Sequence, residues 1–492
     1  MTQKEYLEKI DAVIASGPYS ADWISLSAHP TPDWYRRAKL GIFVHWGIYS
    51  VPAFGNEWYS RNMYNPARRE GQHHVATYGD QKAFGYKDFI PMFQGEYFDA
   101  EAWVSLFKQA GAHYIMPVSE HHDGFAMYDT AFNCWNSVNM GPCRDVMGEI
   151  IKACDAHGLQ FCASNHRAEH YYFMNLGRLI DSDVNDPAYA DFYGPAVFRP
   201  DLDAVNMSDT TETPSTVGPT EEWLVDWMVR ICEFIDNYQP KVLYFDWWIQ
   251  NFSFKPYLKK IAAYYYNCAH QWGKEVTINY KREAFPPGVA TFDVERGALT
   301  DISPVPWQTC TAIGKSSWGY TSDNEFKTSR QIICDLIDIV SKNGNMLLNV
   351  GPRADGSITA EETQVLLELG SWLQCNGEGI YDTVPWKWFG EGEVNAEAGF
   401  FMDGEEKPFT SQDFRFTYAS GCIYAFWLRP EGQQAHIRTL STNGRYDFGI
   451  EKVWLLGREE PVVSVRDAAG LHIRMPEDLP SGLPACFKIQ LL

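Results

Sequence analysis

The sequence predicts an α/β fold built on a (β/α) TIM-like barrel, and two observations indicate it. A short continuous apolar run is typical of a strand buried on both faces. Segments with helical periodicity lie between most of these runs, and such alternation predicts parallel βαβ units. Five runs of this kind, each ending in polar and aromatic residues, are Leu40–Trp46, Tyr114–Phe125, Leu159–His166, Val242–Trp248 and Val276–Arg282.

The polar ends of these runs predict where the chemistry lies. If the sheet closes into a barrel, the carboxyl ends of its strands gather at one rim, where barrel enzymes carry their active sites. The sequence therefore predicts an enzyme whose site combines His45, His121, His122, His166, Asp246 and Lys281.

The remaining elements of the barrel follow from helix signals. Residues 1–33 predict a helical lead-in and a loop with proline, and Asn345–Val350 predicts a last buried strand. Asn175–Gly218 is long and polar, and a loop of that length is usually functional or partly structured. Asp145 and Gly158 are typical helix start and stop signals. Helices are expected at Glu101–Gly111, Asp145–Gly158, Glu222–Tyr238, Pro256–Trp272, Lys327–Asn343 and Thr359–Cys375.

The pattern changes after Pro385, where helical periodicity is absent and short, partly alternating runs begin. This predicts a C-terminal antiparallel β-sandwich. The chain of 492 residues is too long for one core, so we expect a catalytic barrel domain at 1–385 and a sandwich domain at 386–492. The predicted strands are Phe414–Tyr418, Cys422–Leu428, Lys452–Leu456, Val462–Arg466 and Leu471–Met475.

Composition limits the classes of binding partner that we expect and indicates a cellular compartment. Lys and Arg total 41 against 63 Asp and Glu, which disfavours nucleic acid and anionic membrane as partners, although it also serves solubility alone. No run approaches the length of a membrane span. The charged N-terminus lacks a signal-peptide pattern, and eleven cysteines are scattered without CxxC spacing. These features predict a cytoplasmic protein with reduced thiols, although a chain trimmed of its signal would look the same.

Two carboxylates at predicted strand ends are the sharpest candidates for chemistry. Asp246 follows the apolar residues Val242–Phe245 and precedes Trp247, and a buried carboxylate is costly unless it is used or paired. Glu295 lies near the end of another predicted strand. Hydrolysis of a glycoside uses such a pair, one to attack the anomeric carbon and one to protonate the leaving oxygen. A salt bridge or helix cap for Asp246, and a pair with Arg296 for Glu295, are the structural alternatives.

The adjacent histidines His121 and His122 raise the question of a metal. Neighbouring residues on an extended strand point to opposite faces, whereas ligands of one metal must converge, unless the chain bends there. Hydrogen bonds to substrate hydroxyls are therefore favoured, each ring could also be a satisfied core histidine, and no metal or cofactor is expected.

Longer segments resemble the α-L-fucosidases of glycoside hydrolase family 29. The resemblance runs from about Trp34 to Trp386 and implies a barrel with a sandwich and a retaining, exo-acting mechanism without metal. The segments that carry it are AKLGIFVHWGIYSVPAFGNEWYSRNMY, FDAEAWVSLFKQAGAHYIMPVSEHHDGFAMYDT, YQPKVLYFDWW, SSWGY, DIVSKNGNMLLNVGPRADGSI and NGEGIYDTVPW.

The resemblance also implies roles for single residues. Asp246 matches the nucleophile of the family, and Trp318 in SWGY is similar to the aromatic near the methyl group of fucose. Glu295 suits the acid/base position by its distance from Asp246, while Glu57, Glu120 and Glu283 remain alternatives. The positions that match fucose-holding residues are His45, Glu57, Trp58, His121 and His122.

The chain departs from the family pattern at three strand ends. Trp247-Trp248 stands where many members have Gly-Gly, and His166 where many have a tyrosine-rich segment. Lys281 belongs to Asn-Tyr-Lys-Arg, where an Asn-Asp-Arg motif is frequent. His166 and Lys281 are therefore additional candidate substrate contacts, and the departures affect the fine choice of substrate rather than the reaction class.

The sequence thus predicts an exo-acting retaining α-L-fucosidase that acts on terminal α-L-fucosyl residues of glycoconjugates or oligosaccharides. A homo-oligomer is compatible with it. The alternatives are a related exo-glycosidase such as an α-L-galactosidase, a catalytically silent sugar-binding relative, and a metal hydrolase that uses His121 and His122.

Overall fold

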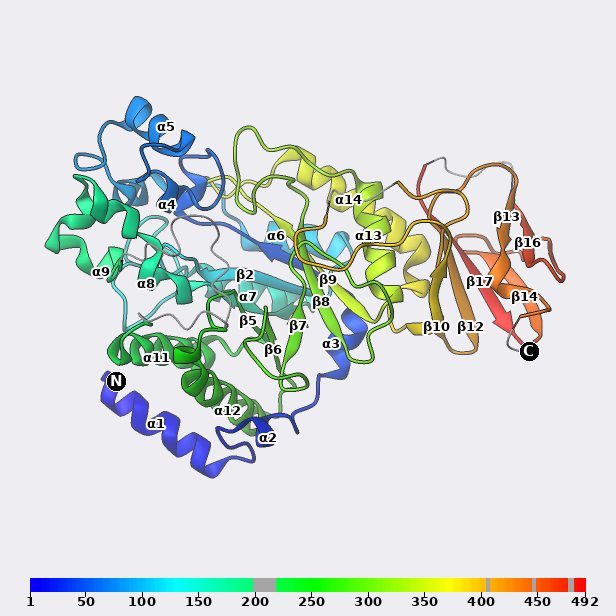
Figure 1. Cartoon of the computed structure of the whole chain (residues 1–492), viewed down its shortest axis with the longest axis horizontal. Coiled ribbons are helices and arrows are strands. Elements are labelled where there is room, and N and C mark those ends of the chain that lie inside the picture. Colours follow the sequence, from blue (N-terminus) through cyan, green and yellow to red (C-terminus); the bar gives the residue numbers. More distant parts are fainter. Residues whose placement is uncertain (198–217, 404–407, 445–447, 477–481) are drawn as a thin grey trace.

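A closed parallel barrel forms the centre of the molecule (Figure 1). The computed structural model describes residues 1–197, 218–403, 408–444, 448–476 and 482–492. The barrel sheet has the order β1-β9-β8-β7-β6-β5-β4-β2, and β1 pairs with β2 to close it. Its strands are β1 (Leu40–Val44), β2 (Tyr114–Glu120), β3 (Gln160–Phe161) with β4 (Ala163–Asn165), β5 (Val242–Phe245), β6 (Thr277–Tyr280), β7 (Thr291–Asp293), β8 (Trp307–Ala312) and β9 (Gly344–Val350).

Six long helices cover most of the barrel and match the predicted ones closely. Their ends carry the expected signals: the Asp145 carboxylate accepts a hydrogen bond from the Gly148 N–H, and Gly158 adopts the left-handed conformation after the same helix. The helices are α6 (Ala100–Gln109), α7 (Val146–His157), α11 (Glu221–Tyr238), α12 (Lys255–Trp272), α13 (Ser329–Ser341) and α14 (Ala360–Asn376).

The alternation of strand and helix fails on one side of the barrel. Within residues 218–403, loops without helices join β6 to β7 and β7 to β8. The C-terminal part of the chain packs beside this region: β10 (Val384–Glu391) and β11 (Phe414–Ala419) contact α13, the helix after β8. The N–H groups of Phe401 and Met402, which follow β10, donate to the carbonyls of Glu295 and Arg296 in the loop after β7. The barrel wall is therefore completed there by residues from outside the barrel sequence.

Shorter helices lie around the barrel ends. The N-terminal helices α1 (Gln3–Ser16) and α2 (Trp23–Leu26) pack along α11 and α12 at one end of the molecule (Figure 1). Of the predicted loop Asn175–Gly218, residues 175–197 form short turns of helix, including α9 (Ala190–Tyr193), and residues 198–217 lie outside the described ones. The others are α3 (Asp33–Ala38), α4 (Tyr59–Asn62), α5 (Arg69–Tyr78) and α8 (His170–Phe173).

Two antiparallel sheets form the C-terminal part, as the short alternating runs predict. One has the order β10-β11-β12-β17-β14 and the other β13-β16-β15, with Phe416, Ile437 and Ile473 in the core they share. The last barrel helix ends at Asn376 and β10 begins at Val384. The domain limit at 385/386 stays a prediction. The further strands are β12 (Cys422–Trp427), β13 (Gln434–Ile437), β14 (Ile450–Leu455), β15 (Ser464–Arg466), β16 (Leu471–Arg474) and β17 (Ala485–Leu491).

Strands β8, β10, β13 and β17 are absent from the sequence prediction. The case of β8 has a clear physical cause: it carries Gln308, Thr309 and Thr311 among its residues and yet is buried throughout. Gln308 is satisfied inside the barrel, where its oxygen accepts from Tyr35 Oη at 2.7 Å and its amide donates to Asp293 Oδ1 at 2.7 Å. A strand that contributes polar residues to the barrel interior has no continuous apolar run, so the pattern used to predict the other strands does not find it.

A buried ion cluster joins the sandwich to the barrel. Asp338 on α13 contacts Arg415 Nε of β11 at 2.5 Å and Lys342 Nζ at 2.7 Å. Arg415 also donates to the Val394 carbonyl at 2.9 Å. Burial opposes ionisation of Asp338, but the two cations outweigh it and lower its pKa. Its charge therefore holds two buried cations in place across the junction.

In the part of the chain that the structure describes, no helix combines the length and the apolarity needed to cross a bilayer.

The Asp338→Asn variant should lose about 3–5 kcal/mol of unfolding free energy, because it leaves Arg415 and Lys342 buried without a counter-charge. The folded pKa of Asp338 lies below the unfolded value of about 4. Its contribution is therefore present at neutral pH and is lost as the pH falls through the folded pKa. Urea unfolding at pH 7 measures the loss, with the exposed Asp301→Asn as matched control. Equal midpoints for the two variants would contradict the prediction.

Candidate active site

A cavity of about 570 Å³ opens at the carboxyl ends of the barrel strands. It contains every site residue that the sequence predicts, so the structure brings all of them together. These are His45, Glu57, Trp58, His121, His122, His166, Asp246, Lys281, Glu295 and Trp318.

The strand ends place these side chains with little freedom. His45, His166 and Asp246 each directly follow a strand, and their N–H groups continue the barrel hydrogen bonding. His45 donates to the Val350 carbonyl at 3.1 Å, His166 to Glu120 at 2.8 Å and Asp246 to Asn165 at 3.3 Å. The side chains are thus carried by backbone that the sheet holds in place, as precise chemistry requires.

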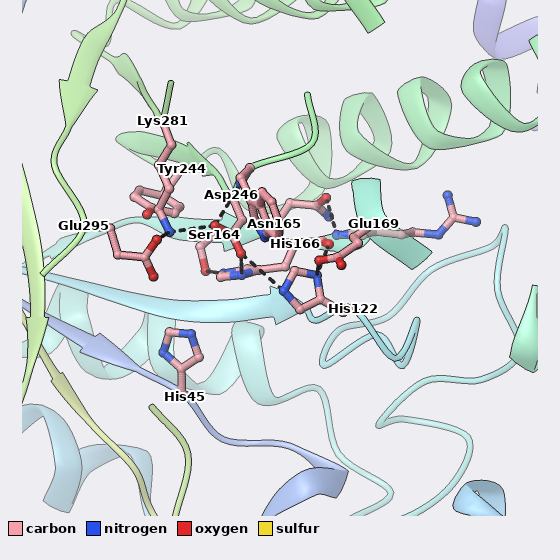
Figure 2. A network of polar contacts seen from close by, with 12 residues as sticks. His45, His122, Ser164, Asn165, His166, Glu169, Tyr244, Asp246, Lys281 and Glu295 are labelled. Carbon is pink, nitrogen blue, oxygen red and sulfur yellow. Dashed lines mark hydrogen bonds and ion pairs between the residues drawn. The ribbon is translucent and has the colours of Figure 1, made fainter. Parts of the chain in front are cut away.

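Asp246 is the centre of the network in Figure 2. Lys281 Nζ lies 2.7 Å from its Oδ1, while His166 Nδ1 at 2.8 Å and His122 Nε2 at 3.3 Å contact its Oδ2. The Trp247 N–H donates to Oδ1 at 2.9 Å. Burial opposes its charge, but Lys281 and the histidines outweigh burial and lower the pKa of Asp246 well below its usual range. The carboxylate is therefore ionised.

Lys281 also binds the second carboxylate. Its Nζ lies 2.6 Å from Glu295 Oε2, so this oxygen and Asp246 Oδ1 are no further apart than about 5.3 Å, the sum of the two distances. Burial raises the pKa of Glu295, Lys281 opposes that rise, and the charge of Asp246 adds to it. A low pKa on one carboxylate and a raised pKa on its neighbour is the arrangement that separates a nucleophile from a proton donor.

The histidines form one wall of the cavity. His45 Nδ1 contacts Asn349 Oδ1 at 2.6 Å, and the ring of His121 lies 5.8 Å from His45 and 4.4 Å from His122. Burial lowers the pKa of His45 and His121 well below the usual value and that of His166 to about 4. These three rings are thus neutral. Both ring nitrogens of His166 contact protein groups, Asp246 Oδ2 and Ser164 Oγ, so His45 Nε2 and the ring of His121 are the better placed for hydrogen bonds with sugar hydroxyls.

His121 and His122 do not follow the alternation of an extended strand. Strand β2 ends at Glu120, and both rings lie in the turn beyond it and line the cavity. The bend that would relax the alternation is present.

Among the residues that the structure describes, two clusters bring potential metal ligands within 4.8 Å of one another. One is His45, His121 and His166, and the other is His122, His166 and Asp246. In each cluster His166 already contacts Asp246 through Nδ1, and the ammonium of Lys281 faces the same carboxylate. A cation at the second cluster would meet that fixed positive charge, so hydrogen bonding to a ligand suits these residues better.

Glu57 and Trp318 support one another across the cavity rim. Glu57 Oε2 accepts from the Trp318 N–H at 2.9 Å and from Ser317 Oγ at 3.1 Å. The Trp318 ring lies 5.2 Å from that of His45 and faces the guanidinium of Arg296 at 4.7 Å. The carboxylate of Glu57 therefore fixes the loop that carries the tryptophan.

The other candidate acids differ in their position. Glu120 is buried against Arg167, with Nε and Oε1 3.0 Å apart, and does not line the cavity. Glu283 is also absent from the cavity lining. Glu295 and Glu57 alone among the four alternatives line it, and Glu295 is the one that shares Lys281 with Asp246.

Sequence reasoning missed several residues in or beside this site, of which Glu169 and Phe401 matter most here. Glu169 is buried, and its Oε2 lies 3.3 Å from His122 Nδ1. Burial opposes a charge on His122, but Glu169 and Asp246 outweigh it and raise the pKa of His122. Its position three residues after His166 was the one available signal. Phe401 lines the cavity from beyond β10, and no pattern in the barrel sequence could have indicated it.

The comparisons with known proteins agree with this geometry. The family model for α-L-fucosidase matches residues 7–378. Human tissue α-L-fucosidase is 29% identical over 95% of this chain and 90% of its own length, and the α-L-fucosidase of Dictyostelium discoideum is 31% identical over 76% and 77%. The crystal structure of Thermotoga maritima α-fucosidase in complex with fucose superimposes with a TM-score of 0.73 at 28% identity, over 96% of this chain and 100% of that one.

A parallel barrel with two carboxylates in the cavity at its strand ends defines, with these relatives, a glycoside hydrolase. The chain belongs to the α-L-fucosidase family.

The Lys281→Met variant should shift the acidic limb of the pH profile of kcat/KM to higher pH. Lys281 favours the ionised form of Asp246, so its removal raises that pKa, and the active ionised fraction is lost at a higher pH. Rates of nitrophenyl α-L-fucoside hydrolysis between pH 3 and 9 measure this, and Lys281→Arg should retain most of the wild-type limb because it keeps the charge. An unshifted limb in Lys281→Met would contradict the assignment.

Proposed function

We propose that this chain is an exo-acting retaining α-L-fucosidase, which hydrolyses terminal α-L-fucosyl residues of oligosaccharides or glycoconjugates. The observation that carries the proposal is the pair of carboxylates on one lysine, Asp246 and Glu295 on Lys281, in the cavity of an α-L-fucosidase-family barrel. Their oxygens lie within about 5.3 Å, in line with the roughly 5–5.5 Å of retaining enzymes and below the 6.5–9.5 Å of inverting ones.

In the proposed first step, Asp246 attacks the anomeric carbon and Glu295 protonates the departing oxygen. The electrostatics support this division, since the pKa of Asp246 is lowered and that of Glu295 is raised. In the second step, Glu295, now ionised, accepts a proton from water as the water attacks the glycosyl-enzyme. Asp246 is uncharged once it forms the bond to the sugar. Lys281 then interacts with the charge of Glu295 alone and stabilises its ionised form.

The cavity walls would hold the sugar. The neutral rings of His45 and His121 suit ring hydroxyls, and His121 Nδ1 has no hydrogen-bond partner in the described part of the chain. His166, whose two ring nitrogens contact Asp246 and Ser164, would instead position the carboxylate of Asp246. Trp318, with Trp58 and Trp247, offers apolar surface for the methyl group of fucose. Hydrogen bonds that strengthen as charge develops on the sugar would add to the rate.

A cytoplasmic location is part of the proposal and has its own support. All eleven cysteines are unpaired, and eight of them are buried. This supports a reducing, cytoplasmic location as part of the proposal. The homo-oligomer stays a prediction.

A panel of nitrophenyl glycosides separates the proposal from its rivals. The protein should hydrolyse the α-L-fucoside, and it should cleave the α-L-galactoside on the order of 100-fold more slowly, because an apolar pocket rejects an added hydroxyl only weakly. Dialysis against EDTA should leave both rates unchanged. A faster rate on the galactoside would make the sugar assignment wrong, and a rate lost to EDTA and restored by zinc or manganese would favour the metal hydrolase. Cleavage of no glycoside at all would favour the silent sugar-binding protein.

Replacement of each carboxylate should have a different signature. Asp246→Gly should lose nearly all turnover of nitrophenyl α-L-fucoside, and azide should partly restore it by attacking from the vacated side to give β-fucosyl azide. Glu295→Ala should impair a disaccharide more than the nitrophenyl substrate, since nitrophenol departs with little protonation. Glu57→Gln is the comparison for the acid/base role. Activity of Asp246→Gly within tenfold of wild type, or the leaving-group signature in Glu57→Gln instead, would reassign the residues.

A further inference from the structure

A segment from the C-terminal part of the chain returns to the barrel beside Glu295. This segment, residues 398–403, follows β10 and is called the strap below (Figure 1). The N–H of Phe401 donates to the Glu295 carbonyl at 2.9 Å, and the N–H of Met402 donates to the Arg296 carbonyl at 2.7 Å. The strap therefore covers the side of the barrel where no helix follows β6 and β7. Its backbone is hydrogen-bonded there to the backbone of Glu295, the acid/base candidate.

The strap is anchored on both sides of Phe401. On one side the Phe400 ring lies 4.3 Å from the guanidinium carbon of Arg282. On the other, Asp403 Oδ2 binds Lys327 Nζ at 2.7 Å and Arg296 at 3.3 Å, and accepts from Thr311 Oγ1 at 2.8 Å. Phe401 is thus held between two fixed neighbours.

The ring of Phe401 is nonetheless left uncovered. It lines the active-site cavity, and 55% of the residue is exposed. Its φ of 59° falls in the left-handed region, which bulky residues seldom adopt. An exposed aromatic ring on an anchored backbone is poorly explained by the packing of the protein itself, and it is a common form of carbohydrate contact because the C–H face of a pyranose packs on an aromatic face.

The position of the ring identifies which part of a substrate it would meet. In the proposed reaction the leaving oxygen departs toward Glu295, so the group attached to that oxygen must lie next to Glu295 and outside the fucose. Phe401 adjoins Glu295 through its backbone and opens into the same cavity.

We propose that Phe401 is the platform for the aglycone, and that the group it receives is a pyranose ring bearing the α-L-fucosyl residue. The proposal rests on the fucosidase function above. It makes the C-terminal part of the chain a determinant of substrate choice.

The test compares two substrates that share the fucosyl group. In α-L-fucosyl fluoride the aglycone is a single atom, whereas an α-L-fucosyl disaccharide presents a pyranose. Phe401→Ala should lower kcat/KM on the disaccharide about tenfold, which corresponds to the loss of one aromatic contact. It should leave kcat/KM on α-L-fucosyl fluoride unchanged. Phe401→Trp, which keeps an aromatic ring, should have kcat/KM on the disaccharide close to that of wild type. Phe252→Ala is the matched control, because Phe252 is 65% exposed but does not line the cavity.

Two measurements distinguish the loss of an aglycone contact from an indirect effect of the substitution on Glu295. Hydrolysis of the fluoride still needs Glu295 as base in the second step, so an unchanged kcat with fluoride, together with an unchanged basic limb of the pH profile, supports the platform. Equal losses on both substrates, a shifted basic limb, or full activity of Phe401→Ala on the disaccharide would overturn it. If the wild-type protein hydrolyses neither substrate, the proposed function fails, and the platform fails with it. Hydrolysis of both by wild type with no effect of Phe401→Ala removes the platform alone.

Discussion

The ammonium of Lys281 between Asp246 and Glu295 is the interaction on which the site depends. Two carboxylates with oxygens within about 5 Å would repel one another by roughly 3 kcal/mol at the effective dielectric of a protein site, and burial would add to that cost. Lys281 offsets both, since it lies 2.7 and 2.6 Å from the two groups. It therefore allows two acids to stand at a separation that the proposed chemistry needs and that their charges alone would oppose.

The layer beneath this lysine is polar as well. Tyr244 Oη donates to Asp293 Oδ2 at 3.2 Å, and Gln308 donates to the other oxygen of the same carboxylate. Hydrogen-bonded polar groups thus share the barrel interior with apolar side chains such as Phe43, Met116 and Leu347. The polar side chains in this layer are positioned by their hydrogen bonds as well as by packing. Buried polar networks of this kind are rigid when all their hydrogen bonds are satisfied.

The parts of the site that could be predicted are those that depend on local sequence. His45, His166 and Asp246 directly follow apolar runs, so their gathering at one rim follows from strand ends alone. The contact of Glu57 with Trp318 joins residues 261 positions apart, and no local pattern carries that information. The pairing of one lysine with two carboxylates likewise needs the barrel register. Strand β8 has no continuous apolar run because Gln308, Thr309 and Thr311 interrupt its apolar residues. Phe401 belongs to a region whose pattern indicates only a sandwich.

The strap has a consequence for the order in which the protein is made. Glu295 leaves the ribosome about a hundred residues before Phe401, and the strap lies between β10 and β11, two neighbouring strands of the sandwich. A barrel that folds during synthesis would thus hold its two acids before the wall beside Glu295 exists. Completion of the active site therefore waits for residues translated about a hundred positions after Glu295. A chain that stops before the strap would keep the carboxylates but lack the fixed surface that the aglycone would contact.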